Sequence, residues 1–175
     1  MNKVETDRLL LRAPREDDAP ALLAIRNSGF VRRFNPMSVW DEKRMRGEIR
    51  EEIENDSAYY IERKADGALL GMIGVEEDEL RYRVRAKGVS YYLDEAYARQ
   101  GYMKEALRTV IRTLFAQDPE LEVVSARVFC GNIASERLLL SLGFTCDGCI
   151  RRCVRMEDGT VFDDMQFSLL RGELR

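Results

Sequence analysis

The sequence contains no histidine. Nucleophilic catalysis by a Ser–His or Cys–His pair is therefore excluded, and most zinc chemistry is excluded with it. Any general base has to be an acidic side chain, a tyrosine, a lysine, a cysteine or a chain of waters. Basic residues do not predominate, because the net charge is −3. A protein that binds nucleic acid directly through a basic surface is thus not expected.

Long apolar runs are also absent. No stretch approaches the roughly 20 apolar residues that span a bilayer. The N-terminal segment Met1–Thr6 is polar and does not resemble a signal peptide. Hydrophobic residues still make up 45% of the 175-residue chain, which is enough for one compact core. We therefore expect a single domain over residues 1–175, a cytoplasmic location and no membrane partner.

Cysteines are few, but three of them lie close together. Cys146, Cys149 and Cys153 form a C-x2-C-x3-C pattern, with Cys130 as a fourth candidate thiolate. Without a neighbouring histidine, small apolar residues in or beside a strand are the favoured interpretation. No metal site is expected.

Apolar runs bounded by turn signals predict the strands. These are Arg8–Arg12, Ala58–Arg63, Ala68–Val75, the end of Arg81–Leu93, Val123–Phe129, Cys146–Arg155 and Val161–Leu170. Asp66-Gly67 and Glu157-Asp158-Gly159 are expected turns, and Ser57–Leu93 is expected to form an antiparallel meander.

Apolar residues at helical spacing predict four helices. The first helix follows Asp17 or Asp18, either of which can cap it. The other three cover Trp40–Asn55, Gly101–Ala116 and Asn132–Leu142. Asn27–Ser38, with Gly29, Asn35 and Pro36, has the composition of a loop. The order of elements predicts an α/β (α+β) fold, with a mixed sheet and helices on both faces.

One segment has the features of an anion-binding site. In Tyr91–Leu107 (YYLDEAYARQGYMKEAL), a strand leads through a short loop to a helix, with Gly101 near the helix start. The first turn of a helix offers unpaired N–H groups and a positive dipole end. Glycine permits close approach of a phosphate, and Arg99 and Lys104 add charge. The alternative is that Gly101 only ends the loop before the helix and binds no ligand.

A second segment is Asn132–Phe144 (NIASERLLLSLGF). Asn132 can cap the helix, Glu136 suits its first turn, and Gly143 ends it. A capped helix explains most of this pattern without a ligand.

Together with Glu5–Arg12 (ETDRLLLR), the stretches Arg99–Leu107 (RQGYMKEAL) and Asn132–Phe144 resemble the Gcn5-related N-acetyltransferase (GNAT) superfamily. The closest resemblance is to the Rim-type branch, which contains N-acetyltransferases of ribosomal proteins and their small-molecule relatives. The resemblance implies a mostly antiparallel central sheet of about six to seven strands. It also implies transfer of acetyl from acetyl-CoA to a primary amine of a protein N-terminus or a small molecule, by direct attack and without a metal. A homodimer is suggested by analogy.

The resemblance also implies roles for particular residues. The pyrophosphate is expected on Arg99, Gln100, Gly101, Tyr102, Met103 and Lys104, and the pantetheine arm on the backbone of Tyr91, Tyr92 and Leu93. Asn132 is expected to hydrogen-bond the cofactor, and Ser135 to act near the thioester sulfur as general acid. A serine bonded to its own helix backbone is the alternative for Ser135.

Several positions depart from the family pattern. In the phosphate loop only Gly101 matches strictly, because Ala98, Arg99 and Met103 stand at the other places. The usual glutamate base falls at Gly88, the usual strand glycine at Ser90 and the usual acid tyrosine at Leu139. Glu76, Glu77 and Glu105 are the available bases, and the choice stays open.

Two other functions stand as alternatives. One is a module that binds acyl-CoA without turnover. The other is a nucleotide-binding protein, which is disfavoured because neither G-x-x-x-x-G-K-[ST] nor G-x-G-x-x-G occurs. The acceptor side is expected in Asn27–Asn55. That segment holds the aromatic residues Phe30, Phe34 and Trp40 and the basic residues Arg32, Arg33, Lys43, Arg44 and Arg46. A solvated helix face is the alternative for these basic residues.

Overall fold

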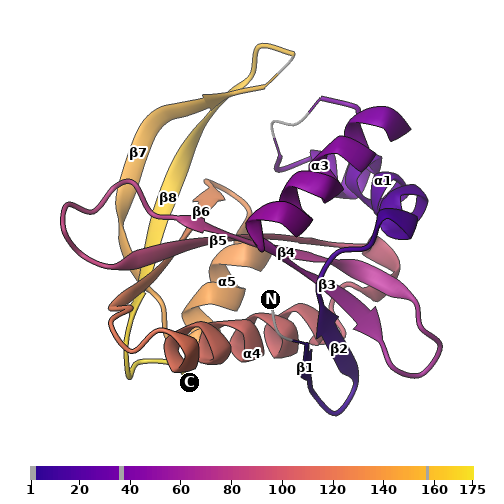
Figure 1. Ribbon diagram of the computed structural model, residues 1–175. Coiled ribbons are helices and arrows are strands. Elements are labelled where there is room, and N and C mark those ends of the chain that lie inside the picture. The colour runs from indigo at the N-terminus through magenta and orange to yellow at the C-terminus, as the bar shows by residue number, and fades with distance from the viewer. Residues whose placement is uncertain (1–2, 36–37, 157) are drawn as a thin grey trace. The chain divides into compact units, whose positions relative to one another are not determined.

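The computed structural model describes residues 3–35, 38–156 and 158–175. Met1, Pro36 and Glu157, which belong to segments interpreted above, lie outside the described residues. The strands are β1 (Val4–Glu5), β2 (Leu9–Arg12), β3 (Ala58–Arg63), β4 (Leu69–Glu77), β5 (Ala86–Leu93), β6 (Val123–Phe129), β7 (Thr145–Arg155) and β8 (Val161–Leu170). The helices are α1 (Ala19–Asn27), α2 (Gly29–Arg32), α3 (Glu42–Asn55), α4 (Tyr102–Gln117) and α5 (Ile133–Leu142), with 3-10 turns η1 (Glu16–Asp18) and η2 (Glu95–Tyr97) (Figure 1).

The strands hydrogen-bond in the order β1-β2-β3-β4-β5-β6-β8-β7. The pairs β1–β2, β2–β3, β3–β4, β6–β8 and β7–β8 are antiparallel, and β5–β6 is parallel. A mixed, mostly antiparallel sheet is therefore confirmed. The predicted strand number was slightly low, because the sheet has 8 strands. The two-residue edge strand β1 is too short to leave a pattern in the sequence.

The chain divides into two compact units. Unit 1 comprises Met1–Gly74 and Tyr91–Val110, and unit 2 comprises Val75–Ser90 and Ile111–Arg175. The single domain expected from the sequence remains a prediction.

Unit 1 has its core where two helices cover the sheet. Its buried side chains are Ala19 and Leu22 of α1, Met45 and Ile49 of α3, Ala58 and Tyr60 of β3, and Met72 of β4. Each large apolar side chain buried in this way contributes about 1.5–3 kcal/mol. Figure 1 shows α1 and α3 on one side of these strands and the beginning of α4 on the other. This confirms the prediction of helices on both faces.

Two local predictions in unit 1 were wrong in part. Asp18 occupies the N-cap position of α1 as predicted, but among the described residues its side chain makes no capping bond to that helix, because its carboxylate binds the guanidinium of Arg12 and the N–H of Arg15. The expected loop from residue 27 onward contains the short helix α2, whose first turn is capped by Ser28 through the N–H of Val31 at 3.2 Å.

Unit 2 is built around β6, β8 and β7. Strand β8 pairs with β6 from Val123↔Leu170 to Phe129↔Asp164, and with β7 on its other edge. The cysteines Cys130, Cys146, Cys149 and Cys153 all have free thiols. In the described part of the chain, no helix is long and apolar enough to cross a membrane.

Candidate active site

The predicted phosphate loop of unit 1 has the backbone of an anion site. After β5, Asp94 caps η2 by accepting the N–H of Ala96 at 3.0 Å. Arg99 and Gly101 then adopt φ angles of 60° and 79°. Left-handed residues of this kind turn neighbouring peptide N–H groups toward one side, which creates a concavity for anions. Gly101 adopts its conformation without the strain that a side chain would bring.

The helix that follows supplies further donors. The first hydrogen bond of α4 joins the N–H of Glu105 to the carbonyl of Gly101 at 3.0 Å. The N–H groups of Tyr102, Met103 and Lys104 precede this bond and therefore lack an acceptor within the helix. Their donors and the helix dipole both favour a negative ligand. Because Arg99 and Lys104 are exposed, their charge is available to such a ligand.

Arg8, next to β2, holds this loop. Its Nη1 donates to the carbonyl of Gln100 at 3.1 Å, and its Nε donates to Glu105 Oε2 at 2.7 Å. Its guanidinium also lies 4.3 Å from the ring centroid of Tyr102. The Gln100 amide donates to the carbonyl of Ala96 at 3.0 Å. The contacts by which Arg8 fixes the loop were not predicted, because they join residues more than ninety positions apart.

Glu105 is committed to this network. Partial burial acts to raise the pKa of Glu105, but hydrogen bonds from Thr6 and Arg8 outweigh it, so the pKa is lowered. A carboxylate with a lowered pKa and two bound donors is a poor general base. Glu105 therefore serves to hold the start of α4 rather than to accept a proton from a substrate.

The end of β5 is held closely by β4. A Cβ at Gly71 would lie 2.2 Å from the carbonyl oxygen of Tyr92 and 2.9 Å from the Cα of Leu93. The N–H of Asp94 donates to the carbonyl of Leu70 at 2.7 Å. Only glycine permits this approach, so Gly71 fixes the backbone of Tyr91–Leu93, where the pantetheine arm was predicted.

A titratable cluster lies beside Tyr92 in unit 1. The Tyr60 hydroxyl donates to the carboxylate of Glu52 at 2.7 Å. Burial raises the pKa of Glu52 to about 7, with the Tyr60 bond opposing and the charge of Glu48 adding to the shift. Burial also raises the pKa values of Tyr60 and Tyr92. Sequence reasoning missed Glu52, since five of the α3 residues are glutamate and nothing in their spacing distinguishes it.

The predicted acceptor segment is partly organised around Trp40. Asn27 accepts the N–H of Trp40 at 3.1 Å and donates to its carbonyl at 2.9 Å. Arg26 and Arg44 lie 3.3 Å and 4.5 Å from the Trp40 ring centroid. Arg26 is buried, its pKa is lowered by that burial, and it was not predicted.

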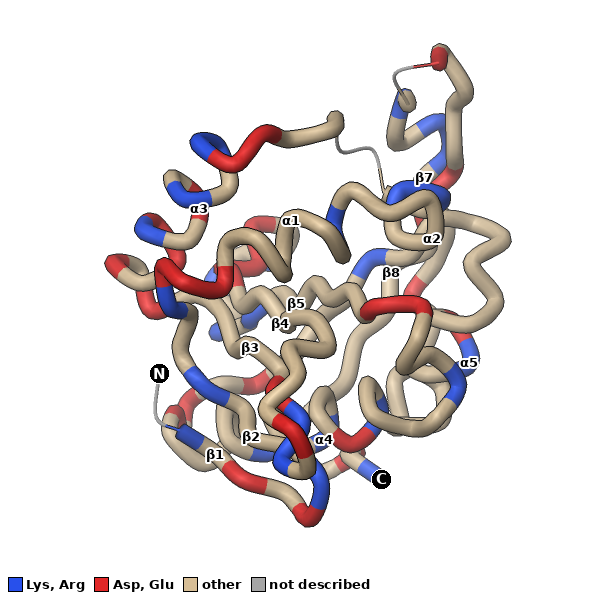
Figure 2. The backbone as a smooth tube through the Cα atoms, turned by 90° about the vertical axis from the view of Figure 1, so that its right-hand side faces the viewer, with Lys and Arg blue, Asp and Glu red and all other residues tan. Residues whose placement is uncertain are grey.

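The basic residues of α3 are offset by acidic ones. Figure 2 shows positive and negative residues alternating along the helix. Arg46 pairs with Glu42, and Arg50 pairs with Glu16 of η1. This mixture of charges favours a solvated helix face over an attractive surface for acidic partners.

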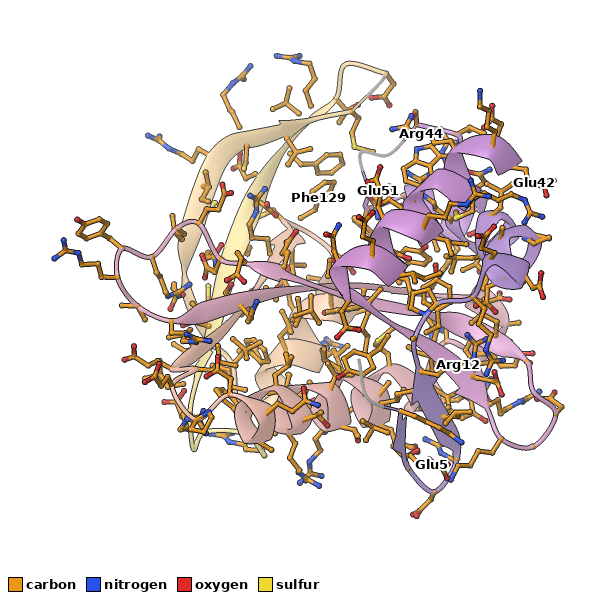
Figure 3. The ribbon with its side chains drawn as sticks, viewed as in Figure 1. Glu5, Arg12, Glu42, Arg44, Glu51 and Phe129 are labelled. Carbon is orange, nitrogen blue, oxygen red and sulfur yellow. The ribbon has the colours of Figure 1, made fainter. Side chains whose placement is uncertain are left out.

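In unit 2, Asn132 begins α5 as predicted. Its Oδ1 accepts the N–H of Ser135 at 3.3 Å, and its own N–H donates to the carbonyl of Phe129 at 2.9 Å. Phe129, at the end of β6, stacks on Phe162 with ring centroids 5.4 Å apart (Figure 3). The structure therefore brings Asn132 and Ser135 together in unit 2, whereas Tyr91–Leu93 and Arg99–Lys104 belong to unit 1. Their roles toward a cofactor stay predictions.

Comparison with known proteins identifies the family. A family model described as an acetyltransferase (GNAT) domain matches residues 8–145. The chain belongs to this GNAT acetyltransferase family. The uncharacterized N-acetyltransferase YoaA of Bacillus subtilis is 28% identical to this GNAT chain over 177 residues, which cover 96% of each protein.

Solved structures share the GNAT fold. The ribosomal-protein-S5-alanine acetyltransferase from Vibrio fischeri matches with a TM-score of 0.83 and 19% identity over 100% of both chains. The microcin C7 self-immunity acetyltransferase MccE, solved with acetyl-CoA and AMP, matches with a TM-score of 0.78 and 17% identity over 94% of this chain and 93% of its own. The resemblance to the GNAT superfamily is thereby confirmed, and the assignment to its Rim-type branch stays a prediction.

Proposed function

We propose that this acetyltransferase moves the acetyl group of acetyl-CoA to a primary amine, on a peptide N-terminus or on a small molecule, by direct attack. The loop before α4 carries the proposal. Positive φ at Arg99 and Gly101, and free N–H groups at the start of a 16-residue helix, form a donor set that fits a pyrophosphate. The acetyl-CoA bound to the similar MccE supports the same assignment.

The other predicted residues then have defined tasks. The backbone of Tyr91–Leu93, fixed by Gly71, holds the pantetheine arm, and an N–H near Leu93 stabilises the developing oxyanion. Asn132 uses its Oδ1 as helix cap, which leaves its amide NH2 to donate to the cofactor. The Ser135 hydroxyl protonates the departing sulfur. Acetyl-CoA supplies an activated acetyl thioester, and holding it beside the amine provides much of the acceleration.

The names of similar proteins support the choice of acceptor classes. They include a ribosomal-protein-S5-alanine acetyltransferase and a microcin C7 self-immunity acetyltransferase. A protein N-terminus and a small-molecule amine are therefore the two acceptor classes to compare. A cytoplasmic location and a homodimeric state stay predictions.

Thermal melting tests the cofactor site first. Acetyl-CoA and CoA are each expected to raise the melting temperature, because binding to the folded state stabilises it by about 2.7 kcal/mol at a hundredfold excess over Kd. ATP is the negative control. Lys104→Ala at the helix start is expected to weaken the shift, and Arg108→Ala, exposed one turn further along α4, is the matched control. No shift with either CoA form at millimolar concentration would refute the proposal.

Release of free thiol from acetyl-CoA tests turnover. The amines are a peptide with a free alanine N-terminus, spermidine, an amino acid and an aminoglycoside. Thiol release that depends on one of them supports the enzyme. A melting shift without thiol release for any of them would instead indicate a module that binds acyl-CoA without catalysis.

A further inference from the structure

The strand pairing of unit 2 changes at Gly88. Strand β5 pairs with β6 from Ala86↔Val123 to Gly88↔Ser125. Among the described residues of unit 2, no further pair joins Val89 or Ser90 to β6, although β6 continues to Phe129. The two parallel strands therefore separate immediately after Gly88, which leaves backbone groups of β5 for a ligand.

The space above Gly88 is occupied by a neighbouring carboxylate. A Cβ on residue 88 would lie 3.0 Å from the Cγ of Glu76 and 3.3 Å from its Oε1. Glu76 belongs to β4, and its side chain crosses the face of β5 that glycine leaves bare. A carboxylate thus lies where a short acidic side chain on residue 88 would place one.

The surrounding acidic groups are already engaged. Glu77 pairs with Lys87, and Asp78 pairs with Arg81. Among the described residues, Glu76 has no hydrogen bond or ion pair, and it is exposed. Of the three candidate bases, only Glu76 combines a free carboxylate with a place at the separation of the strands.

The charges that face Glu76 come from the adjoining strands. The pKa of Arg127 on β6 is raised, chiefly by its hydrogen bond to Asp164 and to a smaller extent by the charge of Glu76. Arg127 is therefore a cation near Glu76. Arg127 Nε donates to Asp164 Oδ2 of β8 at 2.7 Å, and its Nη2 lies 3.6 Å from the thiol of Cys153 of β7. Since Arg127 is neutralised by the buried Asp164, Glu76 leaves this group with a net negative charge that attracts an ammonium.

We propose that Glu76 of β4 is the general base. It accepts the proton that Gly88 of β5, which has no side chain, cannot accept. This assignment rests on the proposed acetyl transfer. The Glu76 carboxylate is exposed, so the proton reaches it through water.

The proton balance of the step is simple. The acceptor ammonium gives one proton through water to the Glu76 carboxylate. The free amine forms the N–C bond as the C–S bond breaks, and the second amine proton goes to the departing thiolate by way of Ser135. The carboxylic acid of Glu76 then returns its proton to solvent, which leaves one amide, one thiol and one released proton per turnover.

Glu76→Gln tests the base. For the alanine peptide or spermidine, whichever wild type acetylates faster, kcat at pH 7 is expected to fall about 100-fold. The Kd for acetyl-CoA, measured by calorimetry, should stay unchanged. The deficit should shrink as the pH is raised, because the amine then loses its proton without help. Glu77→Gln is the matched control, since Glu77 is adjacent and paired with Lys87.

A relocated carboxylate gives the second test. Residue 88 has room for a side chain once Glu76 is shortened, so Glu76→Ala with Gly88→Glu should recover part of the activity that Glu76→Ala loses. A merely structural role for Glu76 predicts no such recovery and no change in the pH profile.

The outcomes separate the two proposals. If wild type acetylates an amine and Glu76→Gln does so at the same rate, the base assignment alone is overturned. Wild type that binds acetyl-CoA but acetylates none of the amines overturns both catalysis and the base. A pH-independent loss in Glu76→Gln, without recovery in the relocated variant, also overturns the base.

Discussion

Glu52 makes the folded protein sensitive to pH near neutrality. Burial raises the pKa of Glu52 from 4.5 to about 7. The folded state therefore binds the proton more tightly than the unfolded state does. The resulting stability is fully present below pH 4.5 and is lost as the pH rises through 7. At 1.36 kcal/mol per unit, the loss amounts to about 3 kcal/mol in the free energy of unfolding.

Glu52→Gln should remove this dependence. Glutamine has the shape of the protonated acid, and its Oε1 can still accept the hydroxyl of Tyr60. In urea unfolding, the variant should be about 3 kcal/mol more stable than wild type at pH 8, and equal to it near pH 4.5. Glu51→Gln, on the exposed side of the same helix, is the control. Equal stability of Glu52→Gln and wild type at pH 8, or the same gain in Glu51→Gln, would refute the reasoning.

Four further substitutions test the architecture. Gly71→Ala forces a Cβ to 2.2 Å from the Tyr92 carbonyl and should cost about 1–3 kcal/mol in urea unfolding. Gly47→Ala in α3, which meets nothing within 4 Å, should gain about 0.5–1 kcal/mol. Arg12→Met leaves the buried Asp18 carboxylate without its cation and should cost about 3–5 kcal/mol, with partial recovery on adding Asp18→Asn; full stability of the single variant would contradict this. Arg8→Ala frees the Gln100 carbonyl and should raise the calorimetric Kd for acetyl-CoA several-fold, whereas Lys43→Ala on α3 should leave it unchanged.

Much of the fold was predictable because its elements carry their own signals. Strands β3, β6 and β8 match their predicted bounds residue for residue. Each is an apolar run between turn residues, so local composition suffices. The cap at Asn132 was also predicted, since a capping bond joins residues three positions apart. Helix α2 was missed because four residues, one of them glycine, give no periodicity.

The site was harder to predict where it depends on register. The loop at Arg99–Gly101 was located by its glycine and the helix that follows. The hold of Arg8 on that loop links positions far apart in sequence, which composition cannot reveal. The contact of Glu76 with Gly88 depends on how β4 aligns with β5, and a one-residue slip would move Glu76 to the other face. Asp18 is a residue type that commonly caps helices, but its carboxylate instead binds the guanidinium of Arg12, a contact that local sequence does not indicate.

The insertion of β8 between β6 and β7 also sets an order of events in time. Strand β7 is synthesised before β8, yet in the described chain its ladder partner is β8. While the ribosome is still making Val161–Leu170, β7 therefore has no neighbouring strand with which to pair. Unit 2 can close only after those last strand residues emerge. A nascent chain halted before Val161 should consequently offer chaperones an unpaired strand, and one released after Leu170 should not.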